Sequence, residues 1–244
     1  MSTLVASIHA EWGKAWGVRA PLLWLLAAVV AALFTATTLA NDFAHAVSTG
    51  ELAPVSTMPT VDAFGPGLTV AQILIVVFAI HLVTPEYSSG SIAPAYLAQP
   101  RRSIVVAAKA IVASLTALIT GLALGPLTVL ASHLMIGDAL GDPLSLGQAA
   151  IRAAGALAPA AVIGVALGFL TRSAVASLAT ALVLLGLTIM APGDHGLYLP
   201  GFASMTFLTG GPGTYGHAIG FLILTGWALG LLVLAAVVTQ RRDA

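Results

Sequence analysis

The stretch AAGALAPAAVIGVALGFLTRSAVASLATALVLLGLTIMA, residues 153–191, is apolar except for a short polar turn at 171–173. On either side of the turn the apolar run approaches the length of about 20 residues with which a helix crosses the hydrocarbon core of a bilayer. Arg172 is its one charged residue. The stretch therefore predicts two membrane-spanning helices, 153–170 and 174–191, joined by a tight turn.

Four further apolar runs of this kind lie at 21–40, 67–83, 110–134 and 218–239, and none contains Asp, Glu, Lys or Arg. The first run is too long for a signal peptide and its leader carries Glu11, so we expect it to remain uncleaved. The chain of 244 residues is 59% hydrophobic and 7% charged, against about a quarter charged in soluble domains. We predict an all-α integral membrane protein with six transmembrane helices in a single domain, residues 1–244.

The charge balance excludes several classes of function. Nine cations and nine acids give a net charge of zero, without the basic surplus of a nucleic-acid-binding surface. The chain has no cysteine, which excludes disulfides, thiol catalysis and cysteine metal sites.

Lysine and arginine near the span ends predict the orientation, because they are enriched on the cytoplasmic side. With both termini inside, Arg152 is the one cation that lies outside. The cytoplasmic cations are then Lys14, Arg19, Arg101, Arg102, Lys109, Arg172, Arg241 and Arg242. We expect a bacterial inner (cell) membrane protein with both termini in the cytoplasm.

Two segments outside the spans carry apolar residues that water would accommodate poorly. In residues 1–20, Leu4, Ile8, Trp12 and Trp16 recur near helical spacing, which predicts an interfacial helix with its cations toward water. In residues 191–217, which are rich in Gly and Pro, a short helix dipping back into the outer leaflet would bury the apolar side chains. A folded cap without a role in transport is an equally good interpretation of that outer re-entrant segment.

Small residues four apart predict close helix contacts, within one bundle rather than between two copies. The pairs are Gly121 with Gly125, Gly164 with Gly168, Gly216 with Gly220, and Gly226 with Gly230. Pro126 predicts a bend or break in the third span.

The inner loop EYSSGSIAPAYLAQPRRSIVVAAKA, residues 86–110, is longer than a connection requires. Thr84, Pro85 and Glu86 predict a helix start, with a hydroxyl cap, a proline and an acid beside the positive end of the dipole. Gln99 before a proline is expected to be extended. Arg102 and Lys109 fall near one helical face, where their stems can reach headgroups or an acidic protein surface. Orientation alone would explain the cations, but the length and shape of segment 84–109 favour a docking role.

This loop resembles the one between the second and third spans of type-2 ABC transporter permeases, where an acid and a Gly-Ser or Gly-Thr pair precede apolar residues, Pro-Arg-Arg and a lysine. Here these are Glu86, Gly90, Ser91, Ile92, Leu97, Pro100, Arg101, Arg102 and Lys109. The leader, with Glu11, Trp12 and Lys14, is similar too. Serine at position 91 departs mildly from the commoner threonine.

The resemblance implies the transmembrane subunit of an ATP-driven exporter, whose inner loop is a coupling helix seated on a separate ATPase. The implied assembly contains two ATPase subunits and a second permease copy or homologue. The chain has no GxxxxGK[ST] phosphate loop, so ATP and Mg²⁺ are expected on the partner, with no cofactor here. The expected ATPase-docking residues are Glu86, Gly90, Ile92, Tyr96, Arg101 and Arg102. Glu86 is expected to pair with a partner cation or a local arginine.

Spans built of Ala, Val, Leu and Gly suit a hydrophobic or amphiphilic cargo: a lipid, a peptide or a drug-like molecule.

Two rival functions stay open. An ion-coupled secondary transporter would use an ionisable group at membrane depth, for which the spans offer only Gln72 and His81 as notable polar side chains. An intramembrane enzyme or a zinc site would need clustered ligands. The candidate ligands have no recognised spacing: they are Asp42 with His45, or Asp194 with His195, completed by His133 or His217. We therefore predict neither an enzyme nor a metal site, and Arg152 is expected to pair with Asp138 or Asp142 or to reach headgroups.

Overall fold

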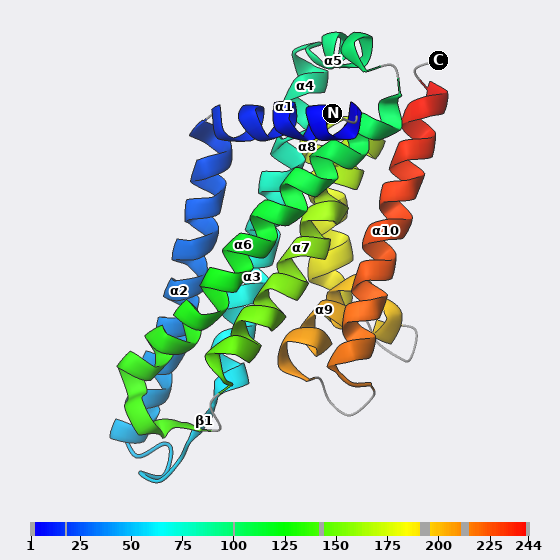
Figure 1. The fold of residues 1–244 in the computed structure, drawn as a ribbon. Coiled ribbons are helices and arrows are strands. Elements are labelled where there is room, and N and C mark those ends of the chain that lie inside the picture. The colour runs from blue at the N-terminus through cyan, green and yellow to red at the C-terminus, as the bar shows by residue number, and fades with distance from the viewer. Residues whose placement is uncertain are drawn as a thin grey trace.

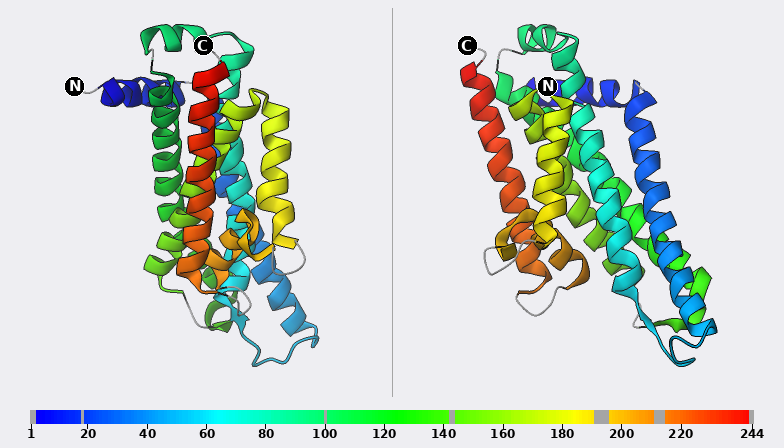
Figure 2. Two further views of the ribbon diagram at one scale, coloured as in Figure 1. Left: turned by 90° about the vertical axis from the view of Figure 1, so that its right-hand side faces the viewer. Right: turned by 180° about the vertical axis from the view of Figure 1, so that it is seen from behind.

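The computed structural model describes residues 3–17, 19–99, 101–141, 144–190, 196–210 and 215–242. Within these ranges the chain is a bundle of long helices (Figures 1 and 2). Five of them are long and apolar enough to cross a membrane: α2 (Arg19–Ser48), α3 (Thr60–His81), α6 (Arg102–Ile136), α7 (Leu146–Thr171) and α10 (His217–Arg242). They correspond to five of the six predicted spans, and the chain is a helical protein of the multi-pass membrane type.

The predicted span at 174–191 differs from the other five. It begins as helix α8 (Ala174–Ala181), continues as a π-helical turn η2 (Leu182–Gly186) and ends as a 3-10 turn η3 (Leu187–Met190). Its apolar helical part, Ala174–Ile189, is shorter than the five spanning helices. The hydroxyl of Thr188 donates to the Leu184 carbonyl, a contact that competes with the regular helical pattern.

One end of the bundle carries the short elements that precede and follow the long helices. Helix α1 (Thr3–Gly17) lies across the bundle there, and α4 (Thr84–Ser88) and α5 (Ile92–Ala98) extend beyond it. The end of α10 lies at the same end, so both termini are together (Figure 1).

The opposite end is closed by loops and a two-stranded parallel sheet, which the sequence did not predict. Strand β1 (Met58–Pro59) pairs with β2 (Leu140–Gly141), which follows the 3-10 turn η1 (Gly137–Ala139). The Thr60 hydroxyl donates to the Gly141 carbonyl at 2.8 Å. Helix α9 (Pro200–Thr209), preceded by the 3-10 turn η4 (Gly196–Tyr198), packs on the same half of the bundle (Figure 1).

Glycines set the closest helix contacts in the core. A Cβ on Gly125 would lie 2.2 Å from the Ala149 oxygen, and one on Gly121 would lie 2.5 Å from Ala154 Cα. This confirms packing within one bundle for that pair. By contrast, a Cβ on Gly226 or Gly230 of α10 would meet no described atom within 4 Å. Gly164 and Gly168 also pack within the bundle, against α3 and Val83. Of the pair Gly216 and Gly220, only Gly220 has a close described neighbour, the Ala203 oxygen at 2.8 Å.

Pro126 does not break the third predicted span, because α6 continues through it from Arg102 to Ile136. A proline inside a helix removes one backbone hydrogen bond, but tight packing can hold the helix on both sides of it. The close approach of α7 to Gly125 supplies that packing.

Candidate functional site

The α4–α5 segment, residues 84–98, is built from two short helices joined by a glycine turn. Gly90 has φ +75°, a left-handed conformation that costs glycine least. The neighbouring Ser89 and Ser91 hydroxyls lie 2.9 Å apart and share a hydrogen bond. At the other end Gln99 has φ −131° and ψ 91°, which confirms the extended residue predicted before the proline.

The start of α4 differs from its prediction. Thr84 was expected to cap α4, but the N-cap is Val83, and no side chain caps the helix. The Thr84 hydroxyl instead donates to the Ile80 carbonyl at 3.1 Å, one turn back in α3. Because α3 and α4 are separated by two residues only, the last carbonyls of α3 are the nearest acceptors.

Aromatic side chains attach the segment to the bundle. The Tyr87 ring packs edge-on against Phe169 of α7 at 6.1 Å between centroids, and the Arg172 guanidinium lies 5.1 Å from the Tyr87 centroid. Tyr87 also shares a hydrogen bond of 3.0 Å with the Tyr96 hydroxyl. Arg102 lies 4.9 Å from the Tyr96 centroid, so α4, α5, α6 and α7 are joined through these rings.

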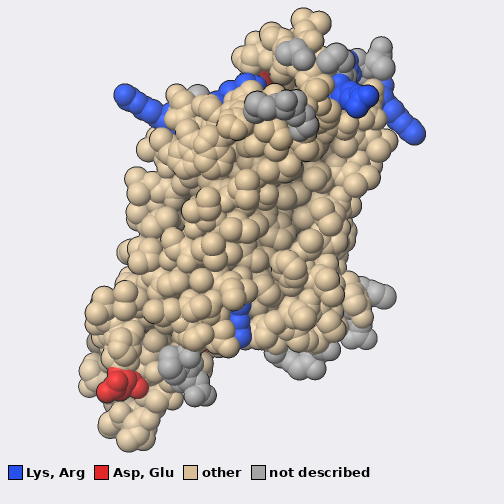
Figure 3. Space-filling view, in the orientation of Figure 1, with Lys and Arg blue, Asp and Glu red and all other residues tan. Residues whose placement is uncertain are grey.

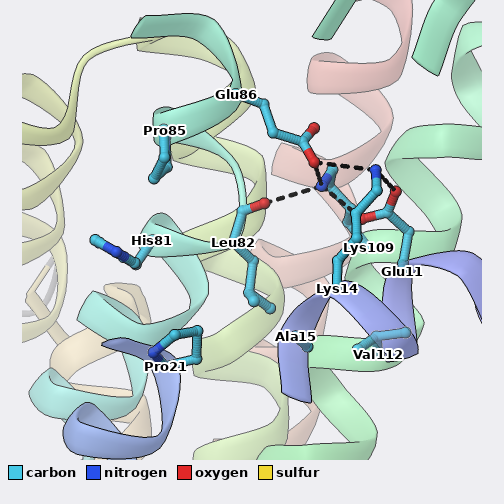
Figure 4. A pocket seen from close by; sticks show the side chains of 10 residues that line it. All are labelled: Glu11, Lys14, Ala15, Pro21, His81, Leu82, Pro85, Glu86, Lys109 and Val112. Atoms are coloured by element: carbon cyan, nitrogen blue, oxygen red, sulfur yellow. Dashed lines mark hydrogen bonds and ion pairs between the residues drawn. The ribbon is translucent and has the colours of Figure 1, made fainter. Parts of the chain in front are cut away.

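Beneath the segment four charged side chains form a closed ring of ion pairs, which we call the ionic ring: Glu11 and Lys14 of α1, Glu86 of α4, and Lys109 of α6. Lys109 Nζ lies 2.6 Å from Glu11 Oε2 and 2.9 Å from Glu86 Oε1. Lys14 Nζ lies 2.7 Å from Glu11 Oε1 and 3.1 Å from Glu86 Oε1. Figure 4 shows the two ammonium groups between the two carboxylates. The ring has no net charge and joins three elements far apart in sequence.

Lys109 is the buried centre of the ionic ring. Lys109 is 2% exposed. Its ammonium group also donates to the Leu82 carbonyl at 2.9 Å, at the C-terminal end of α3. A cation there also meets the negative end of the helix dipole. Lys109 therefore does not reach out with Arg102, and within the chain Glu86 Oε1 pairs with two lysines rather than with a local arginine. Pairing of Glu86 with a cation of a partner subunit stays a prediction.

The ring borders a small cavity of about 230 Å³, lined also by Leu82, Pro85 and His81. The His81 side chain points away from the ion pairs in Figure 4. Glu86 Oε2 is buried and has no hydrogen-bond partner among the described residues, so one acceptor of the ring is free.

Lys14 is the most exposed member of the ring and has a perturbed pKa. Desolvation of its ammonium group acts to lower the pKa, but hydrogen bonds and ion pairs with Glu11 and Glu86 outweigh that effect. The pKa of Lys14 is therefore raised above the ordinary lysine value of 10.5, and the ring keeps this charge at physiological pH.

The predicted docking residues are not equivalent in the structure. Glu86 turns inward to the ionic ring, Ile92 and Tyr96 are half-buried, and Arg101 is exposed. Arg102 is partly buried, and its Nη1 donates to the Thr239 carbonyl at 3.5 Å. The predicted set left out the most exposed large apolar residue of the segment, Leu97, at 84%. The sequence carries a signal for Leu97: it is an apolar residue directly after Tyr96, so it lies on a different face of the same short helix.

A groove of about 530 Å³ separates α1 from α5 beside Leu97's helix. Among the residues that line it are Ala6 and Ala10 of α1 and Pro94 and Ala95 of α5. This end of the molecule is thus hollowed between α1 and α5, and Glu11 and Lys14 of the ionic ring are among the residues that line the groove.

At the opposite end, α9 is anchored by a buried polar bridge. The Ser204 hydroxyl donates to Gln72 Oε1 at 2.9 Å, and the Gln72 amide nitrogen donates to the Ala156 carbonyl at 3.3 Å. Gln72 therefore joins α3, α7 and α9. It is a satisfied core side chain in the described structure.

His217 and Arg152 have local hydrogen-bond partners. His217 Nδ1 lies 2.8 Å from the Phe207 carbonyl. Among the described residues no group of three His, Asp or Glu side chains could hold a metal ion, and residues 194 and 195 lie outside them. Arg152 Nη1 donates to the Leu208 carbonyl at 3.1 Å, rather than pairing with Asp138; Asp142 lies outside the described residues.

Comparison with protein-family models and with curated proteins finds no match to this chain.

Proposed function

We propose that the chain is the transmembrane subunit of an ATP-driven exporter of the type-2 ABC transporter kind, energised by a separate ATPase that docks on the α4–α5 segment. One observation carries the proposal. The face of the segment that contacts the bundle is held by the ionic ring and the tyrosines. On the opposite, solvent-facing side Leu97 is 84% exposed. A solvated loop has no need of such anchoring.

The anchoring gives force a route into the membrane helices. An ATPase that pushes α5 moves α4, and Glu86 transmits this displacement to Lys109 of α6 and to Lys14 of α1. Buried ion pairs suit this task because breaking one leaves an uncompensated charge. The bundle therefore responds as a unit, opening a central path between two permease copies.

The proposed membrane topology has six crossings. Helix α1 and the end of α10 lie at one end of the molecule, which favours an even number of passes, and we assign the sixth to the α8–η3 stretch. Most cations gather at the end that carries α1 and α5 (Figure 3), which favours that end as cytoplasmic. In this orientation α1 lies in the inner interface, with Trp12 and Trp16 partly exposed toward headgroups, and α9 is the outer re-entrant element.

A second permease copy and a hydrophobic or amphiphilic cargo remain parts of the proposal. The open small-residue face at Gly226 and Gly230 offers α10 a surface for close helix contact in lipid. The apolar helices favour a lipid, a peptide or a drug-like cargo over a sugar or an ion.

The test is retention of an ATPase during purification from native membranes. Leu97→Asp is expected to abolish copurifying ATP hydrolysis, because it puts a charge at the centre of the docking surface. The matched control is Val55→Asp, since Val55 is also apolar and exposed, at 89%, but lies in the loop between α2 and β1. Equal retention in both variants would remove the assignment. Tyr96 is a poorer probe because its hydroxyl and ring hold the segment together.

An ion-coupled secondary transporter is the second candidate. The observation that favours it is the free Glu86 Oε2, a buried carboxylate oxygen able to bind a cation. Transport in vesicles that follows an imposed ion gradient without nucleotide, and fails in Glu86→Gln, would establish it instead.

A further inference from the structure

A second hollow lies on the side of the bundle, remote from the ionic ring. It is a groove of about 560 Å³ between α6, α7 and α10, ending at Phe207 of α9. Its lining is apolar apart from Ser114 and Thr225, and the Ser114 hydroxyl is already bonded to the Ile111 carbonyl at 3.1 Å. We call this hollow the lateral groove.

Small side chains on α7 create the lateral groove. Ala154, Gly155 and Ala158 line it in place of larger residues. At Gly155 a Cβ would lie 2.7 Å from the Phe207 ring, so glycine is what lets that ring close one end. Phe207 also packs against Phe221 of α10 at 5.3 Å between centroids, which makes this end of the groove rigid.

A cation lies beside the closed end. Arg152 is in the second turn of α7, next to the groove residue Ile151, and it bonds the carbonyl of Leu208, which follows Phe207. No ion pair joins Arg152 to an acid among the described residues. The hydrogen bond to Leu208 uses one of five guanidinium donors, and the others remain for an anion.

The groove has the length of one bilayer leaflet. It follows α7 from Ile151 to Val162, and eleven residues of helix rise about 16 Å. Half of the hydrocarbon core of a bilayer is about 15 Å. An acyl chain whose headgroup lies at the level of Arg152 would therefore fill the groove and end near the bilayer centre.

We propose that the lateral groove binds one membrane lipid with an anionic phosphate headgroup, the phosphate on Arg152 and an acyl chain along α7. The charge of Arg152 selects the headgroup, and the depth of the groove selects the chain. The site does not depend on the docking of an ATPase, so it stands or falls separately from the proposed function.

The test uses the full chain, purified and delipidated in detergent, and measures bound lipid by native mass spectrometry. Phosphatidylglycerol and phosphatidylcholine with the same acyl chains are compared. We expect preferential retention of phosphatidylglycerol, and a loss of about fivefold in that preference in Arg152→Gln. Arg241→Gln, which removes an exposed cation at the other end, is expected to retain the preference.

Ala158→Phe, which fills the groove, is expected to abolish retention of both lipids, whereas Val175→Phe on the exposed face of α8 should not. Helical content and elution volume establish that each variant is folded. An unchanged preference in Arg152→Gln, or equal binding of glycerol phosphate without acyl chains, would overturn the proposal. So would disulfide-linked dimers formed through Ala158→Cys, because the groove would then hold a second copy.

Discussion

Lys109 is the residue on which the anchoring of α4 depends. It is buried and compensates both Glu11 and Glu86, whose carboxylates are also mostly shielded from solvent. We predict that Lys109→Met destabilises the protein by about 3–5 kcal/mol, because two buried carboxylates lose their shared partner. Unfolding in mixed detergent, followed by circular dichroism, measures the change.

The control for Lys109→Met is the double variant with Glu86→Gln. It leaves Glu11 paired with Lys14 and removes the excess negative charge that Lys109→Met creates, so part of the lost stability should return. A double variant as unstable as the sum of its single variants would show that the two residues are not coupled.

Lys14 adds a pH dependence with a definite sign. Because its pKa is raised in the folded protein, its contribution to stability is fully present below the unfolded value near 10.5 and is lost as pH rises through the folded pKa. We predict that the stability difference between the wild type and Lys14→Met is constant from pH 7 to 9 and shrinks above 10.5. A difference that grows on the alkaline side would contradict the ion-pair assignment.

At this scale the sequence identified the charged residues but not their partners. The sequence analysis singled out all four residues of the ionic ring. It did not predict that Glu11 and Lys109, 98 positions apart, meet at 2.6 Å. Such a contact depends on how α1 folds back across α6, which no local pattern encodes. Lys109 was therefore placed on the outside by helical periodicity alone.

Among the elements, the contact of α6 with α7 tests the packing most sharply. We predict that Gly125→Ala costs about 1–3 kcal/mol, since its Cβ would lie 2.2 Å from the Ala149 oxygen and the helices must separate. Gly226→Ala on α10 has no described neighbour within 4 Å in the chain, so in the monomer in detergent it should be neutral or stabilising by up to about 1 kcal/mol. Thermal unfolding of the two variants side by side measures both values. Equal effects would contradict the helix contacts described here.

Apolar length and small-residue spacing were enough to predict five long helices and the close packing of Gly121 and Gly125 against a neighbouring helix, which is α7. They could not predict the π and 3-10 turns after α8, because these depend on Thr188, whose hydroxyl bonds both the Leu184 carbonyl and the Gly201 amide of α9. The two-residue sheet escaped prediction for the same reason: β1 and β2 are too short to carry an alternating pattern.

For the whole molecule, the absence of cysteine makes the topology directly measurable. We predict that a membrane-impermeant maleimide labels Val55→Cys in intact cells, and labels Leu97→Cys only after the membrane is opened. Both side chains are highly exposed, so accessibility reports the side of the membrane. Labelling of both positions in intact cells would contradict a membrane crossing by α3 with the α4–α5 segment on the cytoplasmic side.

The central claim is that a separate ATP-binding subunit docks on the solvent-exposed face of α5, which carries Leu97. A photo-cross-linking amino acid at position 97 in native membranes tests it most directly, with position 55 as the control. The account predicts that position 97 captures a protein whose peptides contain a GxxxxGK[ST] phosphate loop, and that position 55 does not. Capture of lipid alone at position 97, in membranes that contain the whole transport system, would contradict it.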